Sequence, residues 1–172
     1  QQENGMMRGF QLWLNLPAKD KMIEPWYKDY QNPDLPKYTA DNGTLVTIIA
    51  GQCHGIKGAV QREHTEPLYL DVQLPADQRF DAQIPAGHNA FIVVYEGQLE
   101  VDGKVVKPTN LAILSNDPEA DGVSLTALED SRVLVIAGKP LNEPIFQHGP
   151  FVMNTKDEIV QAFNDYQAGL MA

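Results

Sequence analysis

The chain has 172 residues, of which 43% are hydrophobic and 21% charged, a composition typical of soluble globular proteins rather than disordered or fibrous ones. Its 23 acidic residues outnumber its 13 basic ones, and the net charge of −10 repels nucleic-acid phosphates and anionic lipid. No apolar run reaches the roughly 18 residues that a membrane-spanning helix needs. We therefore expect one domain with extensions, no membrane insertion and no direct nucleic-acid binding.

The cysteine content bears on the cellular compartment of the protein, and the first residues bear on how the chain begins. Cys53 is the sole cysteine, so no internal disulfide can form, which favours a reducing compartment and predicts a cytoplasmic protein. Gln1 stands where an initiator methionine would be, and the residues after it lack the basic start and apolar core of a signal peptide. We expect the sequence to continue a longer chain that was cleaved, shortened or left with a remnant of purification.

The N-terminal quarter predicts one strand and a linker. Residues 9–16 alternate apolar and polar side chains, the pattern of a strand with one buried face. Pro17 ends this strand, and residues 18–30, which include Pro25, support at most short helical turns; Pro33 and Pro36 follow before residue 42. Because about 25 residues without regular structure are unusual inside one domain, we interpret residues 18–42 as a linker between two units.

The spacing of strand and turn signals in the middle of the chain is typical of a small antiparallel barrel or sandwich. Short β-branched or alternating runs, separated by Gly, Pro, Asn and Asp turns, predict about eight strands. The predicted strands cover 44–50, 59–64, 68–74, 90–96, 98–101, 104–106, 111–114, 123–128 and 132–137. The densest signal lies in residues 84–114, where Asp102-Gly103 is the pair that best suits a type I′ turn between two strands. We expect this hairpin to organise an all-β fold.

The end of the chain predicts an extended segment, rich in proline, followed by a helix. Thr155 and Glu158 form a capping box at the start of this helix. Its apolar face consists of Ile159, Ala162, Phe163 and Tyr166. This face and the apolar face of residues 9–16 each require a partner surface.

The four histidines and the cysteine are the main candidates for chemistry. His64 and Glu66 would share one face of a continuing strand, a spacing suited to a metal, but Pro67 favours a solvated loop. Cys53 and His54 are adjacent and would point to opposite faces of a strand. We therefore prefer a packed thiol beside a surface or hydrogen-bonded histidine to a shared metal.

The remaining motifs have structural explanations. His88 and His148 lie in turn sequences, where a satisfied turn residue is preferred to an acid or a base. The glycines of residues 51–58 do not have the spacing of a nucleotide-binding loop. Residues 42–44 match a glycosylation acceptor, but a turn before a strand explains them. The sequence thus predicts no catalytic residue, no cofactor-binding residue and no metal ligand in this chain.

Three blocks of sequence resemble the pirin family. They are residues 8–17 (RGFQLWLNLP), 21–25 (KMIEP) and 147–155 (QHGPFVMNT), the last before an acidic helix. The blocks occur in the order found in pirins, and the resemblance covers the whole chain but only the second half of the family. It implies a bicupin, two β-barrels joined by a linker, in which three His and one Glu of the first barrel hold iron or another divalent metal. Those ligands would lie before Gln1.

The resemblance implies a division of the chain. Residues 1–17 would be the last strand of the N-terminal cupin, 18–42 the interdomain linker, 43–140 the C-terminal cupin barrel, and 141–172 the return segment and helix. The expected fold class is all-β, a cupin-type antiparallel jelly-roll barrel with an N-terminal linker strand and a C-terminal α-helix. Without the first barrel, the following side chains would be exposed: Leu12, Leu14, Ile159 and Phe163. We expect the chain to associate with the N-terminal cupin half, or with itself through these end segments.

The general cupin pattern tests whether this barrel holds a metal. The pattern has a His-x-His pair and a Glu before a Gly, here Gly97, and a further His after a Pro-x-Gly that begins here at Pro108. Asn110 replaces the second Gly, and the ligand positions fall on Ile84, Ala86, Ala90 and Ile113. Since apolar side chains offer no electron pair to a cation, we expect a metal-free barrel. The resemblance implies the same.

For the intact protein, the resemblance implies a metal-dependent oxygenase of the quercetin 2,3-dioxygenase type, which opens the flavonol ring oxidatively. This half would form a wall at the entrance of the metal site in the first barrel, without supplying a catalytic residue. The alternative is a regulatory module that contacts transcription factors or metabolic enzymes, with the metal as a redox sensor and the acidic surface facing a basic partner. A sugar-binding or storage-type single cupin is disfavoured, because the apolar residues Ile84, Ala90 and Ile113 offer little to a sugar.

Overall fold

The computed structural model describes residues 9–170, which form two units. One unit spans Trp26–Leu141, and the other combines the chain up to Pro25 with the chain from Asn142 onward. We call them the barrel unit and the end unit. Arg8 and the rest of the first eight residues lie outside the described part, although the predicted segments 1–17 and 8–17 include them. Among the described helices, none has the length and apolar character needed to cross a bilayer.

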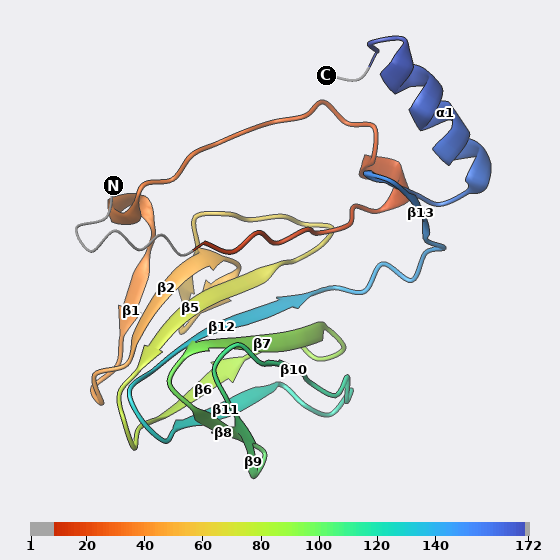
Figure 1. Ribbon diagram of the computed structural model, residues 1–172. Helices are drawn as coiled ribbons and strands as arrows, with labels where there is room; N and C mark the ends of the chain where they lie inside the picture. Colours follow the sequence, from red (N-terminus) through yellow and green to blue (C-terminus); the bar gives the residue numbers. More distant parts are fainter. Residues whose placement is uncertain (1–8, 171–172) are drawn as a thin grey trace. The chain divides into compact units, whose positions relative to one another are not determined.

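The barrel unit is built from two antiparallel sheets (Figure 1). The six-stranded sheet has the order β1-β2-β5-β12-β7-β10, and the four-stranded sheet has the order β6-β11-β8-β9. The strands of the first sheet are β1 (Lys37–Thr39), β2 (Leu45–Ala50), β5 (Leu68–Leu74), β12 (Ser131–Gly138), β7 (Asn89–Glu96) and β10 (Leu111–Ile113). Those of the second are β6 (Arg79–Gln83), β11 (Gly122–Ala127), β8 (Leu99–Val101) and β9 (Lys104–Val106).

The core lies between the two sheets because the strands alternate apolar and polar residues. In β5 every second residue from Leu68 to Leu74 is buried, as the period of two predicts. Leu70 pairs with Val135 of β12, and Val72 pairs with Val133, so aliphatic side chains meet across the strands. Full burial of such a side chain stabilises the fold by about 1.5–3 kcal/mol. The antiparallel barrel with a C-terminal helix, predicted from sequence, is confirmed.

The predicted hairpin is present. Leu99 pairs with Val106 and Val101 with Lys104, across a turn in which Asp102 and Gly103 have φ angles of 49° and 70°. Positive φ at both positions is the requirement of a type I′ turn. Because this signal is local in sequence, it identified the strands correctly.

Within the barrel unit, one predicted strand is wrong, and several short strands of this unit were missed. Residues 59–64 form only an isolated bridge between Val60 and Ala50, because the chain turns at residues 63–65 before Pro67. The missed strands are β1, β6, β3 (Gln52–Cys53) and β4 (Ile56–Lys57). All are five residues or shorter, too short for a clear periodic signal.

Part of the predicted linker belongs to the barrel unit. The Tyr30 hydroxyl donates to the Ala59 carbonyl at 3.1 Å, and the Arg62 guanidinium lies 3.8 Å from the centre of the Trp26 ring. Short 3₁₀ turns, η1 (Ala18–Asp20) and η2 (Asn32–Asp34), agree with the predicted turns. The contacts of Trp26 and Tyr30 therefore hold this extended segment to the barrel unit.

The described part of the end unit contains one α-helix and one hairpin, besides the 3₁₀ turn η1. The helix α1 (Lys156–Gln167) lies against β13 (Phe146–His148) and β14 (Phe151–Met153). Its predicted capping box is confirmed, since the Glu158 amide donates to Thr155 Oγ1 at 3.2 Å and the Thr155 amide donates to Glu158 Oε2 at 2.8 Å. Ile159 is buried and Phe163 is half-buried, so the predicted exposure of both is wrong. Phe163 packs edge-on against His148 and Phe151 of this hairpin, which was not foreseen.

The predicted strand over residues 9–16 is not formed. These residues have no regular secondary structure, and no described strand lies beside them to accept their backbone hydrogen bonds. Their large apolar side chains are exposed, as Leu12 and Leu14 were predicted to be: Phe10, Leu12, Trp13, Leu14 and Leu16. Alternation alone could not produce a strand without a neighbouring edge.

Candidate functional site

A cleft of about 950 Å³ in the barrel unit is lined by residues of the edge strands β9 and β10, among others. We call it the β9–β10 cleft. Its inner wall is apolar and includes Ile84, Ala90, Val101 and Val106. Polar side chains stand around its rim, including Asn110, Asn116 and Asp117. An apolar wall combined with polar side chains that can orient a ligand is a feature of binding sites.

Three of the four positions at which the general cupin pattern places metal ligands line this cleft. Ile84, Ala90 and Ile113 all contribute to its surface, whereas Ala86 does not. None of these side chains has an atom that can coordinate a cation. Within residues 9–170, no group of three or more His, Cys, Asp or Glu side chains could hold a metal ion. The residues present in this cleft therefore do not fit a metal.

One polar cluster adjoins the cleft. His88, which is 8% exposed, lines the cleft and places Nε2 3.4 Å from Glu66 Oε2. The other carboxylate oxygen of Glu66 accepts a hydrogen bond from Lys139 Nζ at 2.7 Å. This hydrogen bond, with the charges of Lys139 and His88, lowers the pKa of Glu66. Glu66 is thus a carboxylate held between an ammonium group and an imidazole.

The other ring nitrogen of His88 has no hydrogen-bond partner among residues 9–170. Nδ1 is buried and makes no hydrogen bond to the described residues. If Nε2 donates toward Glu66, a tautomer inferred from the contacts, Nδ1 is an acceptor without a donor. Such a buried polar atom costs about 1–3 kcal/mol. His88 can therefore position a donor group, but alone it does not make a catalytic centre.

The structure separates the candidate residues that sequence placed together. His64 is exposed in a turn, which confirms the preferred loop interpretation, and Glu66 contacts His88 and Lys139 instead. The partners Glu66 and Lys139 are 73 positions apart in the chain. No local motif could have revealed this cluster.

Cys53 and His54 also behave as the preferred interpretation states. Cys53 is buried in the core, and burial raises the pKa of its thiol to about 11. His54 is exposed and stacks on Tyr38 with ring centres 4.4 Å apart. His148 packs edge-on against Phe163 at 5.4 Å. These contacts are structural, since a thiol that stays protonated is a weak nucleophile and a weak metal ligand.

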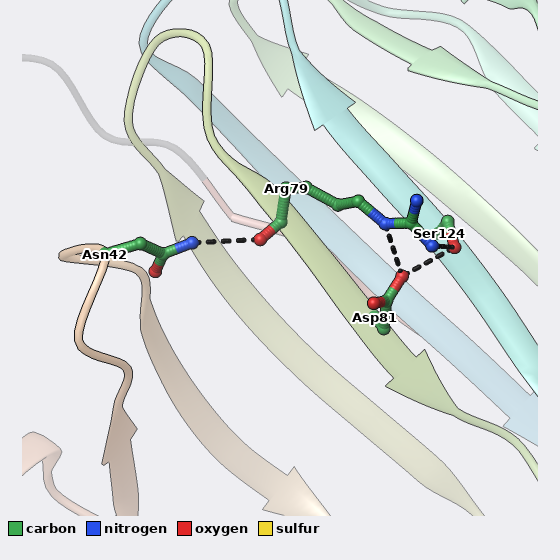
Figure 2. A network of polar contacts seen from close by, with 4 residues as sticks. All are labelled: Asn42, Arg79, Asp81 and Ser124. Atoms are coloured by element: carbon green, nitrogen blue, oxygen red, sulfur yellow. Dashed lines mark hydrogen bonds and ion pairs between the residues drawn. The ribbon is translucent and has the colours of Figure 1, made fainter.

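A second polar network lies on the outer face of the four-stranded sheet (Figure 2). Asp81 Oδ1 accepts from Arg79 Nε at 2.9 Å and from Ser124 Oγ at 2.5 Å, while Arg79 Nη2 donates to Ser124 Oγ at 2.7 Å. The hydrogen bonds of Ser124 and Arg79 lower the pKa of Asp81, so it is a poor base for activating the serine. Asn42 Nδ2 donates to the Arg79 carbonyl at 2.9 Å, and Asn42 Oδ1 accepts from the Thr44 amide, as expected of a turn. We interpret this network as cross-strand pairing.

Comparison with known proteins places the chain in a family. The Pirin C-terminal cupin domain matches residues 69–172. The chain is 47% identical over 180 residues to a Pseudomonas aeruginosa protein whose name proposes quercetin 2,3-dioxygenase activity, covering 100% of this chain and 62% of that protein. Human pirin is 38% identical over 165 residues, which cover 92% of this chain and 55% of pirin. The chain thus spans 62% of the length of the Pseudomonas protein and 55% of the length of human pirin.

A solved structure agrees with the sequence comparisons. The crystal structure of a quercetin 2,3-dioxygenase from Acinetobacter baumannii superimposes with a TM-score of 0.83 and 37% sequence identity, covering 91% of this chain and 54% of that one. The chain therefore belongs to the pirin family and corresponds to the C-terminal half of its members.

Proposed function

We propose that the chain is the half of a two-barrel pirin that does not bind a metal. The intact protein would be a metal-dependent oxygenase of the quercetin 2,3-dioxygenase type, cytoplasmic, with iron or another divalent metal in the N-terminal barrel. The names of the relatives and their greater length support this proposal. The observation that carries it is the apolar character of Ile84, Ala90 and Ile113, which line one cleft at metal-ligand positions.

The end unit would join this half to the other. Residues 9–16 expose a row of large apolar side chains, of which Trp13 is 71% exposed. Covering such a row stabilises an assembly by about 25 cal/mol for each Å² of apolar surface removed from water. The N-terminal cupin half is the proposed cover, and a second copy of the end unit is the substitute when that half is absent.

The test compares this chain with a two-barrel protein in which the N-terminal barrel of the Pseudomonas relative precedes it. Both are loaded anaerobically with Fe(II), desalted and measured for bound metal and for oxygen uptake with quercetin. We expect stoichiometric metal and chelator-sensitive uptake in the two-barrel protein, and neither in this chain alone. Stoichiometric metal on this chain alone would contradict the proposal.

A regulatory role that depends on protein binding is the second candidate. The observation that favours it is an uncharged edge strand, β10, beside the cleft. The same oxygen-uptake measurement separates the two candidates. Turnover no faster than that of free metal, with the metal correctly bound, would favour the regulatory role.

A further inference from the structure

The two main sheets end in four edge strands, and one of them differs from the rest. Edge strands present unpaired backbone groups, and proteins usually protect them with charged residues, proline or bulges. Lys37 lies in β1, Arg79 and Asp81 lie in β6, and Lys104 lies in β9. No charged residue occurs between Pro108 and Asn116, the segment that contains β10. β10 is therefore the edge without electrostatic protection among these four.

The open side of β10 offers both backbone groups and apolar surface. The Leu114 amide donates to the Ala90 carbonyl and the Asn110 carbonyl accepts from the Val94 amide, so the even-numbered residues face β7. Because backbone groups alternate along a strand, Leu111 and Ile113 direct their N–H and C=O groups away from β7. Their side chains are 52% and 82% exposed.

A hollow lies on each side of this edge. The β9–β10 cleft has a volume of about 950 Å³, and a second hollow of about 260 Å³ lies against Phe91. The two hollows share four lining residues: Ala90, Leu111, Ile113 and Leu114. A strand added to β10 would send alternate side chains to its two faces, and the larger hollow could receive one set of them.

We infer that β10 is a docking edge for an extended peptide segment of another protein. The segment pairs antiparallel with β10, the more stable arrangement per residue, and inserts large apolar side chains at alternate positions into the β9–β10 cleft. The loop that follows β10 carries three exposed carboxylates and no basic residue: Asp117, Glu119 and Asp121. An antiparallel segment therefore carries basic residues before its apolar core. The inference does not depend on the proposed oxygenase activity.

A second copy of this chain fits the edge less well. Two copies of β10 paired antiparallel about Ala112 would exchange hydrogen bonds between Leu111 and Ile113. Ala112, the residue at the centre of such a pair, has only a methyl group with which to fill a hollow of about 950 Å³. Each chain also carries a net charge of −10, which opposes self-association.

The probe is a fluorescein-labelled peptide, Lys-Arg-Thr-Ile-Thr-Phe-Thr-Ile, titrated with the complete 172-residue chain and followed by anisotropy. Its apolar residues alternate with threonine and follow two basic residues. Ile113→Pro removes the N–H on the open edge and leaves the pairing of its neighbours with β7 in place. Ile113→Thr is the matched control, because it keeps this N–H and the β propensity. We expect Ile113→Pro to weaken binding at least about fivefold more than Ile113→Thr does.

The peptide supplies a control that does not alter the protein. N-methylation at the residues whose amides face β10 should abolish binding, whereas N-methylation at the alternate residues should leave it unchanged. Equal effects of the two methylation patterns would overturn the inference, as would failure of the peptide to bind. So would sedimentation showing that the chain alone dimerises and that Ile113→Pro loses the dimer whereas Ile113→Thr keeps it.

Discussion

The barrel unit and the end unit bury their apolar side chains to different extents. In the barrel unit, inward-facing residues such as Leu70, Val72 and Val135 are fully buried between two sheets. In the end unit, Ile159 and Ala162 are buried, but residues 9–16 expose most of their apolar side chains. The barrel unit therefore contains its own core, whereas the end unit requires an additional surface.

The reactivity of Cys53 should report opening of the barrel unit. Its thiol is buried and its pKa is raised to about 11, so little reactive thiolate forms at pH 8 in the folded protein. For a unit stable by about 5 kcal/mol, labelling through opening should be about 5,000-fold slower than in the unfolded chain. Labelling with a thiol reagent in native buffer and in urea measures this ratio. Comparable rates in both would contradict a closed core.

Truncation in the core should remove a large part of the stability. Leu70 is 1% exposed, and Leu70→Ala should lower the free energy of unfolding by about 2–5 kcal/mol, through lost burial and the cavity left behind. Ile113→Ala is the matched control at the exposed edge, where a change within about 0.5 kcal/mol is expected. Urea unfolding of both variants provides the comparison. Equal losses would show that β10 is as well packed as β5.

Removal of the helix cap should affect the end unit alone. Thr155→Ala deletes the hydroxyl that accepts from the Glu158 amide, and should destabilise α1 by about 0.5–2 kcal/mol. Amide hydrogen exchange resolves the two units: protection should fall in residues 156–167 and stay unchanged in β5 and β12. Thr155→Ser, which keeps the hydroxyl, should restore most of the protection. A loss in β5 as large as that in α1 would mean that the units unfold together.

The smallest expected effect concerns Glu66. Its pKa is lowered in the folded protein, mainly by the hydrogen bond from Lys139, so its contribution to stability is complete above its unfolded pKa of about 4.3. The contribution is lost as the pH falls through the lowered folded pKa. Glu66→Gln should therefore reduce the melting temperature slightly at pH 7 and not at pH 2. A difference that grows on acidification would have the wrong sign.

The features that the sequence predicted best are those that depend on a few neighbouring residues. The turn at Asp102-Gly103 and the cap at Thr155 each depend on a few adjacent residues, and both are present. Residues 9–16 and 59–64 have strand-like side chains but lack a neighbouring strand, because pairing is decided by distant parts of the chain. Local patterns therefore predict turns and caps more securely than strand pairing.

In the candidate site, too, contacts between distant parts of the chain could not be predicted from local patterns. The cupin pattern located Ile84, Ala90 and Ile113, and the structure shows that they line one cleft. The contact of His88 with Glu66, and of Glu66 with Lys139, could not be predicted because the three residues come from separate loops and strand ends. That β10 is an unprotected edge could not be predicted from the sequence, because this prediction requires the order of the strands in the sheet.

The central claim is that the β9–β10 cleft of this half does not coordinate a metal. Titration of the 172-residue chain with Co(II), followed by visible absorption, tests this most directly, because coordination by protein nitrogen or sulfur ligands changes the intensity and position of the cobalt bands. We expect the spectrum of aqueous Co(II) throughout. Intense bands that saturate at one equivalent, and that disappear in Glu66→Gln or His88→Ala, would contradict it.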